Sequence, residues 1–228
     1  MQPNQKLLTN EGKQVALFPL QQIYISQADY ETFSHEDWYY ATDYLGYIDG
    51  LRVLRCPCYA PVDIECVWID ESECVALWQS IEKVYLANGT IDYLGLIVYH
   101  DNDIQNGLIT VGTIKLQGEE FNKTGTGGNV TGDHLHLETG YGKYETSTSG
   151  AKGTSEYKYH FTDYTACKRL HNYDALFING TDEIVSPIAY LWKTYDSGYV
   201  PDNPVILTKK TKFPWVILMS KKRKSRKF

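Results

Sequence analysis

His134, His136 and Glu138 stand at alternate positions of one short stretch, residues 132–138. If this stretch is a strand, the three side chains lie on one face and the two leucines between them enter the core. Two imidazoles side by side suit a metal site, in which one ring binds the ion and the other handles protons. A His-x-His pair alone is a weak signal, because two histidines on a strand face arise easily by chance. Its surroundings therefore decide its interpretation.

A glycine-dense segment, residues 124–132, runs directly into the histidine stretch. Glycine permits positive φ angles and close backbone approach, so we expect a loop shaped against a site. A phosphate-binding loop is the competing interpretation. It fails because the glycines are followed neither by a Gly-Lys-Ser/Thr ending nor by a helical pattern.

Residues 127–138 resemble the signature of the lysostaphin-type zinc metallopeptidases, which are peptidoglycan endopeptidases with a glycine-rich turn before His-x-His. That family also carries an upstream His and Asp as metal ligands and a further His on an intervening strand. Candidates stand in this order in the chain: His35, Asp43 and His100. The resemblance covers roughly residues 30–140, and its specificity comes from the ordered co-occurrence of these residues. It is closest to the phage-borne lysins and tail-associated members.

The first two candidates depart from the family's spacing. The usual motif separates His from Asp by three residues, whereas seven residues stand between His35 and Asp43. A longer connection is feasible if the His lies on a loop and the Asp on the strand that follows. Asp37 and Asp49 remain alternative ligands, and His100 is also interpretable as an ordinary strand end.

The resemblance implies a role for each residue. The expected ligands of a catalytic Zn²⁺, which leave a fourth position for water, are His35, Asp43 and His136. His134 is the expected general base, and His100 is expected to orient the water or stabilise the oxyanion. Glu138 is expected to hold a histidine ring in its tautomer. His160 and His171 are interpreted as ordinary surface or packing residues.

These roles predict a zinc endopeptidase that hydrolyses peptide cross-links or stem peptides of bacterial peptidoglycan. A phage lysin (endolysin) or a tail-associated wall hydrolase is expected, located in the virion tail or in the host cytoplasm before release. The expected partners are peptidoglycan and other phage tail proteins. The alternative is a catalytically inactive wall-binding or structural tail module on the same fold.

The elements that position these residues are short runs of alternating polarity, separated by Gly, Asn and Asp. Strands are predicted at residues 40–48, 66–69, 94–99, 108–114 and 134–139. Helical patterns are few and short, and the one at residues 74–86 is the weakest. The predicted fold class is all-β dominated: an antiparallel β-sheet metallopeptidase core with long loops and a C-terminal extension.

The length of 228 residues, with 43% hydrophobic and 14% aromatic residues, predicts one large folded domain with extensions. Residues 1–29 are expected to form an N-terminal extension, residues 30–200 the zinc endopeptidase domain with its core motifs in 30–140, and residues 201–228 a basic tail. Residues 140–159 have little apolar content, which predicts a long surface loop.

The formal net charge of −6 is divided unevenly along the chain. Nine Lys and Arg and no acidic residue follow Thr208, which leaves 13 basic and 28 acidic residues, or −15, in the rest. The tail is expected to contact anionic envelope polymers or a membrane, with no specific nucleic acid as partner, although a solvated terminus is the alternative. The start of the chain lacks the pattern of a secretory signal, and no apolar run reaches the length of a membrane span.

Five cysteines leave one without a possible partner, so reduced thiols are expected. A structural zinc at Cys56 and Cys58 is disfavoured, because a single residue separates them and paired zinc ligands usually have two or more between them. Buried thiols at strand positions are the preferred interpretation.

Overall fold

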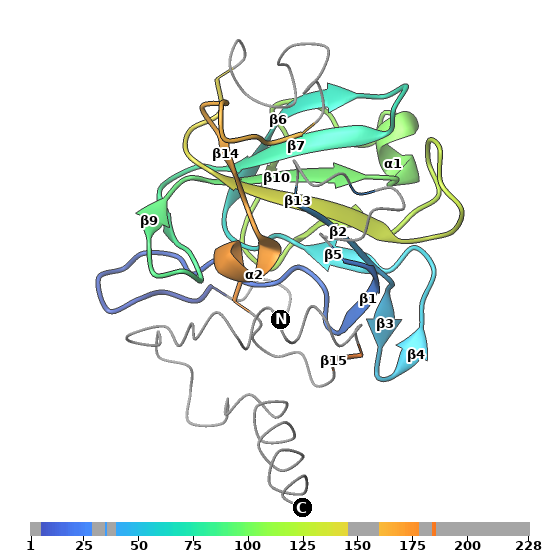
Figure 1. The fold of residues 1–228 in the computed structure, drawn as a ribbon, viewed down its shortest axis with the longest axis horizontal. Coiled ribbons are helices and arrows are strands. Elements are labelled where there is room, and N and C mark those ends of the chain that lie inside the picture. The colour runs from blue at the N-terminus through green and yellow to red at the C-terminus, as the bar shows by residue number, and fades with distance from the viewer. Residues whose placement is uncertain (1–5, 29–34, 36–39, 146–159, 178–183, 186–228) are drawn as a thin grey trace, which may run out of the picture.

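The computed structural model describes residues 6–28, 35, 40–145, 160–177 and 184–185 (Figure 1). Strands dominate these residues, which confirms the predicted antiparallel β architecture. The strands are β1 (Ile23–Gln27), β2 (Ala41–Tyr44), β3 (Tyr47–Ile48), β4 (Leu51–Arg52), β5 (Pro57–Tyr59), β6 (Ile64–Asp70), β7 (Val75–Ser80), β8 (Val84–Tyr85), β9 (Ile91–Asp92), β10 (Leu94–Tyr99), β11 (Ile114–Lys115), β12 (Glu120–Lys123), β13 (Leu135–Tyr141), β14 (Lys168–Leu170) and β15 (Ile184–Val185). The helices are α1 (Asn102–Gln105) and α2 (Asn172–Ala175).

One sheet forms the scaffold of the described part of the chain. Its nine strands follow the order β11-β6-β7-β10-β13-β2-β1-β15, with β14 also paired to β13. The pairs are antiparallel except for β1 with β15. Strand β13 pairs with β10 along one edge, and along the other edge it pairs first with β2 and then with β14 (Figure 1). It is therefore fixed from both sides.

The two faces of this sheet bury different clusters. The main core, on what we call the inner face, includes Leu96, Val98, Leu135 and Leu137. The opposite or outer face carries a smaller buried cluster, formed by Val75, Leu77, Ile97, Phe161 and Cys167. Successive residues of a strand point to opposite faces, so the leucines of β13 enter the main core and the residues between them face outward.

Two predictions about elements are wrong. Residues 108–114 do not form a strand: Leu108 and Val111 are exposed, and Gly107 and Gly112 have positive φ angles, so the apolar pattern belongs to exposed turns. Only Ile114 lies in a strand. The weak helical pattern at residues 74–86 is strands β7 and β8. All of β7 is buried, and a strand covered on both faces loses the alternation that distinguishes it from a helix.

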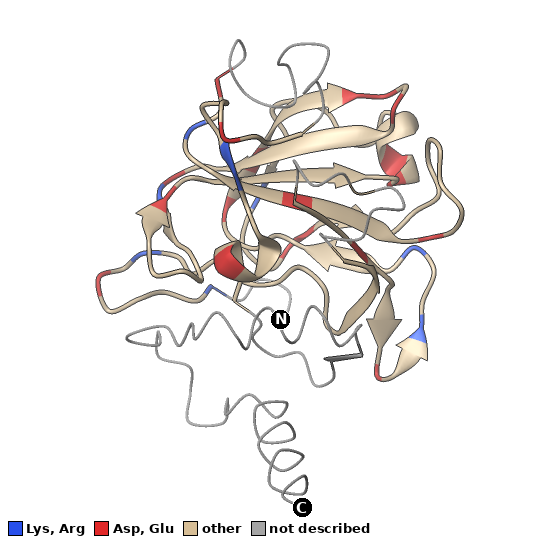
Figure 2. Ribbon diagram, in the orientation of Figure 1, with Lys and Arg blue, Asp and Glu red and all other residues tan. Residues whose placement is uncertain are grey.

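The predicted N-terminal extension packs against the rest of the chain. It contributes β1 to the sheet, and Phe18, Leu20 and Ile23 to the main core. Most of the predicted loop, from residue 146, and all of the basic tail lie outside the described residues. Acidic residues are spread over strands and connections of the described part and do not gather on one side (Figure 2).

The five cysteines are buried and form no disulfide. Burial raises the pKa of Cys56 to about 11 and that of Cys66 to about 12, so these thiols stay protonated at neutral pH. In the described part of the chain, no helix has the length and apolar character that a membrane span requires.

Candidate metal centre

Strand pairing brings an aspartate and a histidine together on the outer face. Asp43 of β2 lies directly opposite His136 of β13, and Tyr99 of β10 lies opposite His136 on the other side. The Tyr99 ring meets the His136 ring edge to face, with 4.7 Å between centroids. The carboxylate and the imidazole are therefore placed by the register of the sheet, and the tyrosine restricts the rotation of the imidazole.

Three side chains converge with the geometry of metal ligands. Asp43 Oδ1 lies 3.0 Å from His136 Nδ1 and 3.3 Å from His35 Nε2. One ligand atom from each residue lies within 4.8 Å of the other two. Among the residues that the structure describes, this is the one group of three or more His, Cys, Asp or Glu side chains close enough to hold a metal ion. The Nδ1 atom of His35 donates to the carbonyl oxygen of Ala28 at 3.0 Å, which directs Nε2 toward Asp43.

The donor set fits zinc. Two imidazole nitrogens and a carboxylate oxygen are common ligands of a catalytic zinc. Ligand atoms about 2.1 Å from a tetrahedral ion lie roughly 3.4 Å apart. Asp43 Oδ1 lies 3.0 Å from His136 Nδ1 and 3.3 Å from His35 Nε2, both close to that value.

The pKa values of Asp43 and His136 are strongly shifted. Burial alone would raise the pKa of Asp43, but hydrogen bonds from His136 and His35, together with the charges of His136 and His134, hold it well below its usual range. Burial would likewise lower the pKa of His136, but Asp43 and Glu138 raise it to about 9. Without a metal, His136 is therefore positively charged at neutral pH, and an arriving cation must displace a proton.

Two further histidines lie beside this group. His134 Nδ1 donates to the carbonyl oxygen of Gly132 at 2.9 Å, and His100 Nδ1 donates to that of Gly127 at 2.8 Å. Their ring centroids are 4.6 Å apart, and His134 Nε2 lies 3.4 Å from Asp43 Oδ2. Burial and the neighbouring charge of His136 lower the pKa of His100 to about 4. His100 is thus a neutral imidazole with a lone pair on Nε2.

The glycine-rich segment holds these two histidines in place. Gly125 exchanges both backbone hydrogen bonds with His134, and the N–H of Gly127 donates to the carbonyl oxygen of His100. A Cβ atom on Gly125 would lie 2.0 Å from that same carbonyl oxygen. His100 itself has a φ of 75°, which is uncommon for a residue other than glycine. The glycine thus permits the close approach that places His100 beside His134.

Glu138 lies behind His136 and is fully enclosed. Its Oε1 atom is 3.5 Å from His136 Nε2 and also accepts a short hydrogen bond from His160 Nδ1. Burial would raise the pKa of Glu138, but the charge of His160 and the hydrogen bond with His136 lower it to about 2. The glutamate is therefore ionised at neutral pH.

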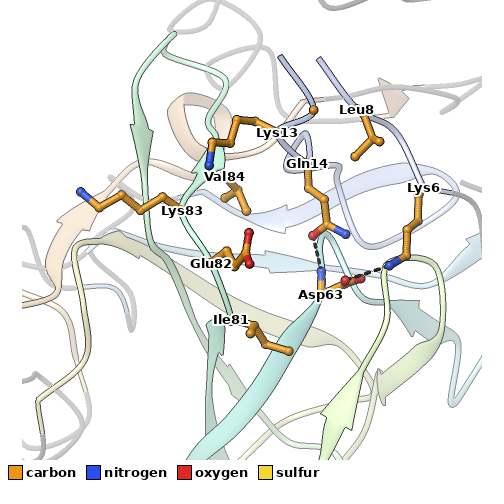
Figure 3. A pocket seen from close by; sticks show the side chains of 10 residues that line it. Lys6, Leu8, Lys13, Gln14, Asp63, Ile81, Glu82, Lys83 and Val84 are labelled. Atoms are coloured by element: carbon orange, nitrogen blue, oxygen red, sulfur yellow. Dashed lines mark hydrogen bonds and ion pairs between the residues drawn. The ribbon is translucent and has the colours of Figure 1, made fainter. Parts of the chain in front are cut away.

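A hollow of about 310 Å³ lies away from this group, between the N-terminal segment and the β7–β8 connection (Figure 3). Asp63 accepts from Lys6 at 2.9 Å, and its own N–H donates to Gln14 at 2.8 Å. Ile81 lines this hollow just after β7, whereas Val75 at the start of β7 pairs with Tyr99 beside His136. The length of the strand separates the two regions by roughly 20 Å.

Comparison with known proteins finds relatives in sequence and distant similarities in structure. No family model matches the chain. Morphogenesis protein 1 of Bacillus phage B103 is 35% identical over an alignment of 199 residues, which covers 84% of this chain and 48% of that protein. The chain therefore spans about half the length of this relative.

The structural similarities are weak. A zinc-containing peptidase from Vibrio cholerae aligns with a TM-score of 0.36 and 15% identity, over 58% of this chain and 41% of that one. Lysostaphin from Staphylococcus simulans aligns with a TM-score of 0.34 and 11% identity, over 87% and 62%. Scores of this size carry no argument about activity, so the interpretation of the site rests on its own geometry.

The structure brings all six candidate site residues together. They are His35, Asp43, His100, His134, His136 and Glu138. Of the two alternative ligands, Asp49 lies in the β3–β4 turn and is not part of the group, and Asp37 lies outside the described residues.

Sequence reasoning missed one residue of this arrangement, His160. It was interpreted as an ordinary histidine, whereas it contacts Glu138. His160 follows a stretch without periodicity and is far along the chain from His136, so no local pattern links the two residues. Only the three-dimensional arrangement reveals the contact.

Proposed function

We propose that the chain is a zinc-dependent endopeptidase that hydrolyses peptide cross-links or stem peptides of bacterial peptidoglycan, as a phage lysin or tail-associated wall hydrolase. The observation that carries this proposal is the convergence of His35, Asp43 and His136, with His100 and His134 beside them. Two imidazoles and a carboxylate are the donor set of a catalytic zinc, and two further histidines beside them are suited to proton transfer. The phage relative supports the phage context.

The chemistry divides between the ion and two histidines. A bound zinc lowers the pKa of a water molecule toward 7 and polarises a carbonyl group. His134 and His100 each donate through Nδ1 to a backbone carbonyl, so the Nε2 atoms are the proton acceptors. His134, which also lies 3.4 Å from Asp43, is the proposed general base.

His100 has a narrower proposed role than the family resemblance implies. Its low pKa and its bond to Gly127 leave Nε2 without a proton at neutral pH. A nitrogen without a proton accepts hydrogen bonds and cannot donate one to an oxyanion. Orientation of the attacking water is therefore the role that we assign to His100.

A second function is a structural or assembly module without catalysis. The name of the relative, morphogenesis protein 1, favours this alternative. The two functions differ in one respect that can be measured, because only the enzyme releases soluble fragments from a purified wall.

The test is hydrolysis of purified sacculi by the full chain. The wild type is expected to release muropeptides, to lose this activity with a zinc chelator and to regain it with added zinc. His136→Ala is expected to be inactive, and His171→Ala, which changes a histidine stacked on Tyr40 away from the group, is expected to be active. Hydrolysis that resists chelation, or no hydrolysis by a zinc-loaded protein, would contradict the enzyme. Mass spectrometry of the fragments would identify the bond that is cut.

The basic tail has a separate proposed role in binding an anionic envelope surface. Nine Lys and Arg after Thr208 flank the apolar residues 213–219, a composition that favours association with anionic polymers or headgroups. A chain that ends at Thr208 is expected to bind sacculi and anionic vesicles more weakly than the full chain does. Equal binding by both would contradict this role.

A further inference from the structure

Two glycines leave space for the side chain of Phe161 on the outer face of the sheet. Gly95 of β10 and Gly140 of β13 lie directly opposite each other. A Cβ atom on Gly95 would lie 2.8 Å from Phe161 Cζ, and one on Gly140 would lie 2.9 Å from Phe161 Cγ. The phenyl ring therefore occupies the space that two side chains would otherwise fill. Phe161 is completely buried there, which anchors the residue before it, His160.

Hydrogen bonds also fix the segment that follows Phe161, residues 162–167. The hydroxyl of Thr165 donates toward the carbonyl oxygens of Thr162, at 3.0 Å, and Cys167, at 2.6 Å. Cys167 is buried in the same cluster as Phe161, and the chain then enters β14, which pairs with β13. His160 is thus attached to a segment that is fixed on β13, the strand that carries His136.

This anchoring places His160 on the glutamate behind His136. His160 Nδ1 donates a short hydrogen bond to Glu138 Oε1, and the same oxygen lies 3.5 Å from His136 Nε2. The other oxygen, Oε2, accepts from the N–H of Phe161 at 3.3 Å. Only 1% of the Glu138 side chain is exposed, so water cannot easily replace a lost partner.

We propose that His160 is a positioning residue of the metal centre, which holds Glu138 Oε1 so that His136 keeps its proton on Nε2 and presents Nδ1 beside Asp43. The inference rests on the proposed zinc site. A carboxylate that accepts from the second nitrogen of a metal-bound imidazole fixes its tautomer and orientation and increases its basicity. Glu138 Oε1 faces His136 Nε2 across 3.5 Å, and the hydrogen bonds from His160 Nδ1 and from the Phe161 N–H hold the carboxylate in this position.

Three variants distinguish positioning from general loss of structure. His160→Ala removes the donor to Glu138, whereas His160→Asn retains an N–H close to the position of Nδ1. His171→Asn is the matched control, because His171 stacks between Tyr40 and Tyr173 and is not a member of the metal-ligand group. Zinc affinity is measured by competition with a chromogenic chelator, and the tautomer of His136 by ¹⁵N NMR of the imidazole nitrogens in the zinc-loaded protein.

We expect His160→Ala to bind zinc roughly 10 to 100 times more weakly than the wild type and to lose the defined Nε2–H signal of His136. His160→Asn is expected to stay within about threefold of the wild type, as a rescue by a retained donor. The control should match the wild type. If His160→Ala binds zinc with wild-type affinity and keeps the His136 tautomer unchanged, the positioning role is wrong, but the proposed metal centre is not affected. Failure of the wild type to bind zinc would overturn the metal centre, and the positioning role with it.

Discussion

Zinc binding should displace a proton from His136, and the size of this effect follows from its pKa of about 9. At pH 7 that value leaves His136 about 99% protonated, because the pH is roughly two units below the pKa. Direct ligation requires the neutral ring. Removing the proton therefore weakens the apparent affinity at pH 7 by roughly 100-fold, or about 3 kcal/mol, relative to the fully deprotonated site.

The assay is zinc binding as a function of pH with chelator-buffered free metal. The apparent Kd is expected to tighten by at least about tenfold per unit between pH 6 and pH 8. Calorimetry at pH 6, in buffers with different enthalpies of ionisation, should show the release of at least about one proton per zinc, because a zinc-bound water with a pKa near 7 is still largely protonated there. A Kd that is constant between pH 6 and pH 8, with no proton released at pH 6, would refute the assignment of His136 as a charged group in the metal-free site.

Three other predictions concern individual residues. His136→Ala should lose zinc, whereas His134→Ala should keep most of it and turn over roughly 10²- to 10⁴-fold more slowly. Equal loss of zinc from the two variants, measured by elemental analysis, would show that the two roles are exchanged. Gly125→Ala should displace His100, because the carbonyl oxygen of His100 would lie 2.0 Å from the new Cβ. We expect kcat to fall by on the order of 100-fold with zinc retained. A kcat within a fewfold of the wild type in steady-state kinetics would contradict this. The pKa of Glu138 is lowered to about 2, so the ionised carboxylate stabilises the metal-free fold fully at pH values above its ordinary pKa of 4.5. This contribution, up to about 3 kcal/mol, is lost as the pH falls from 4.5 toward 2. In denaturant unfolding, the free energy of unfolding of Glu138→Gln should therefore fall less over this pH range than that of the wild type, and identical pH profiles would refute the prediction.

The part of the site that lies on one strand could be predicted from the sequence. Alternation along a strand places His134, His136 and Glu138 on one face whatever the partners are; His136 and Glu138 lie in β13, and His134 directly precedes it and faces Asp43. The antiparallel β class followed in the same way from local alternation. Local alternation failed at β7, because a strand buried on both faces has no polar side to reveal its period.

The part of the site that depends on distant segments could not be derived from spacing. The contact between Asp43 and His136 is set by the register of β2 against β13, and register is a property of the whole sheet. Only the family resemblance pointed to Asp43 and to His35. The contact of His160 with Glu138 depends on Phe161 filling the space beside two glycines, and neither the sequence pattern nor the resemblance indicated it.

The most direct test of the account is the position of the metal in a crystal of the zinc-loaded protein, determined from anomalous scattering on the two sides of the zinc absorption edge. The account predicts one strong peak on the outer face of the sheet, about 2.0–2.2 Å from His35 Nε2, Asp43 Oδ1 and His136 Nδ1. A zinc-loaded crystal with no peak among these three atoms, or with its peak at other residues, would contradict it.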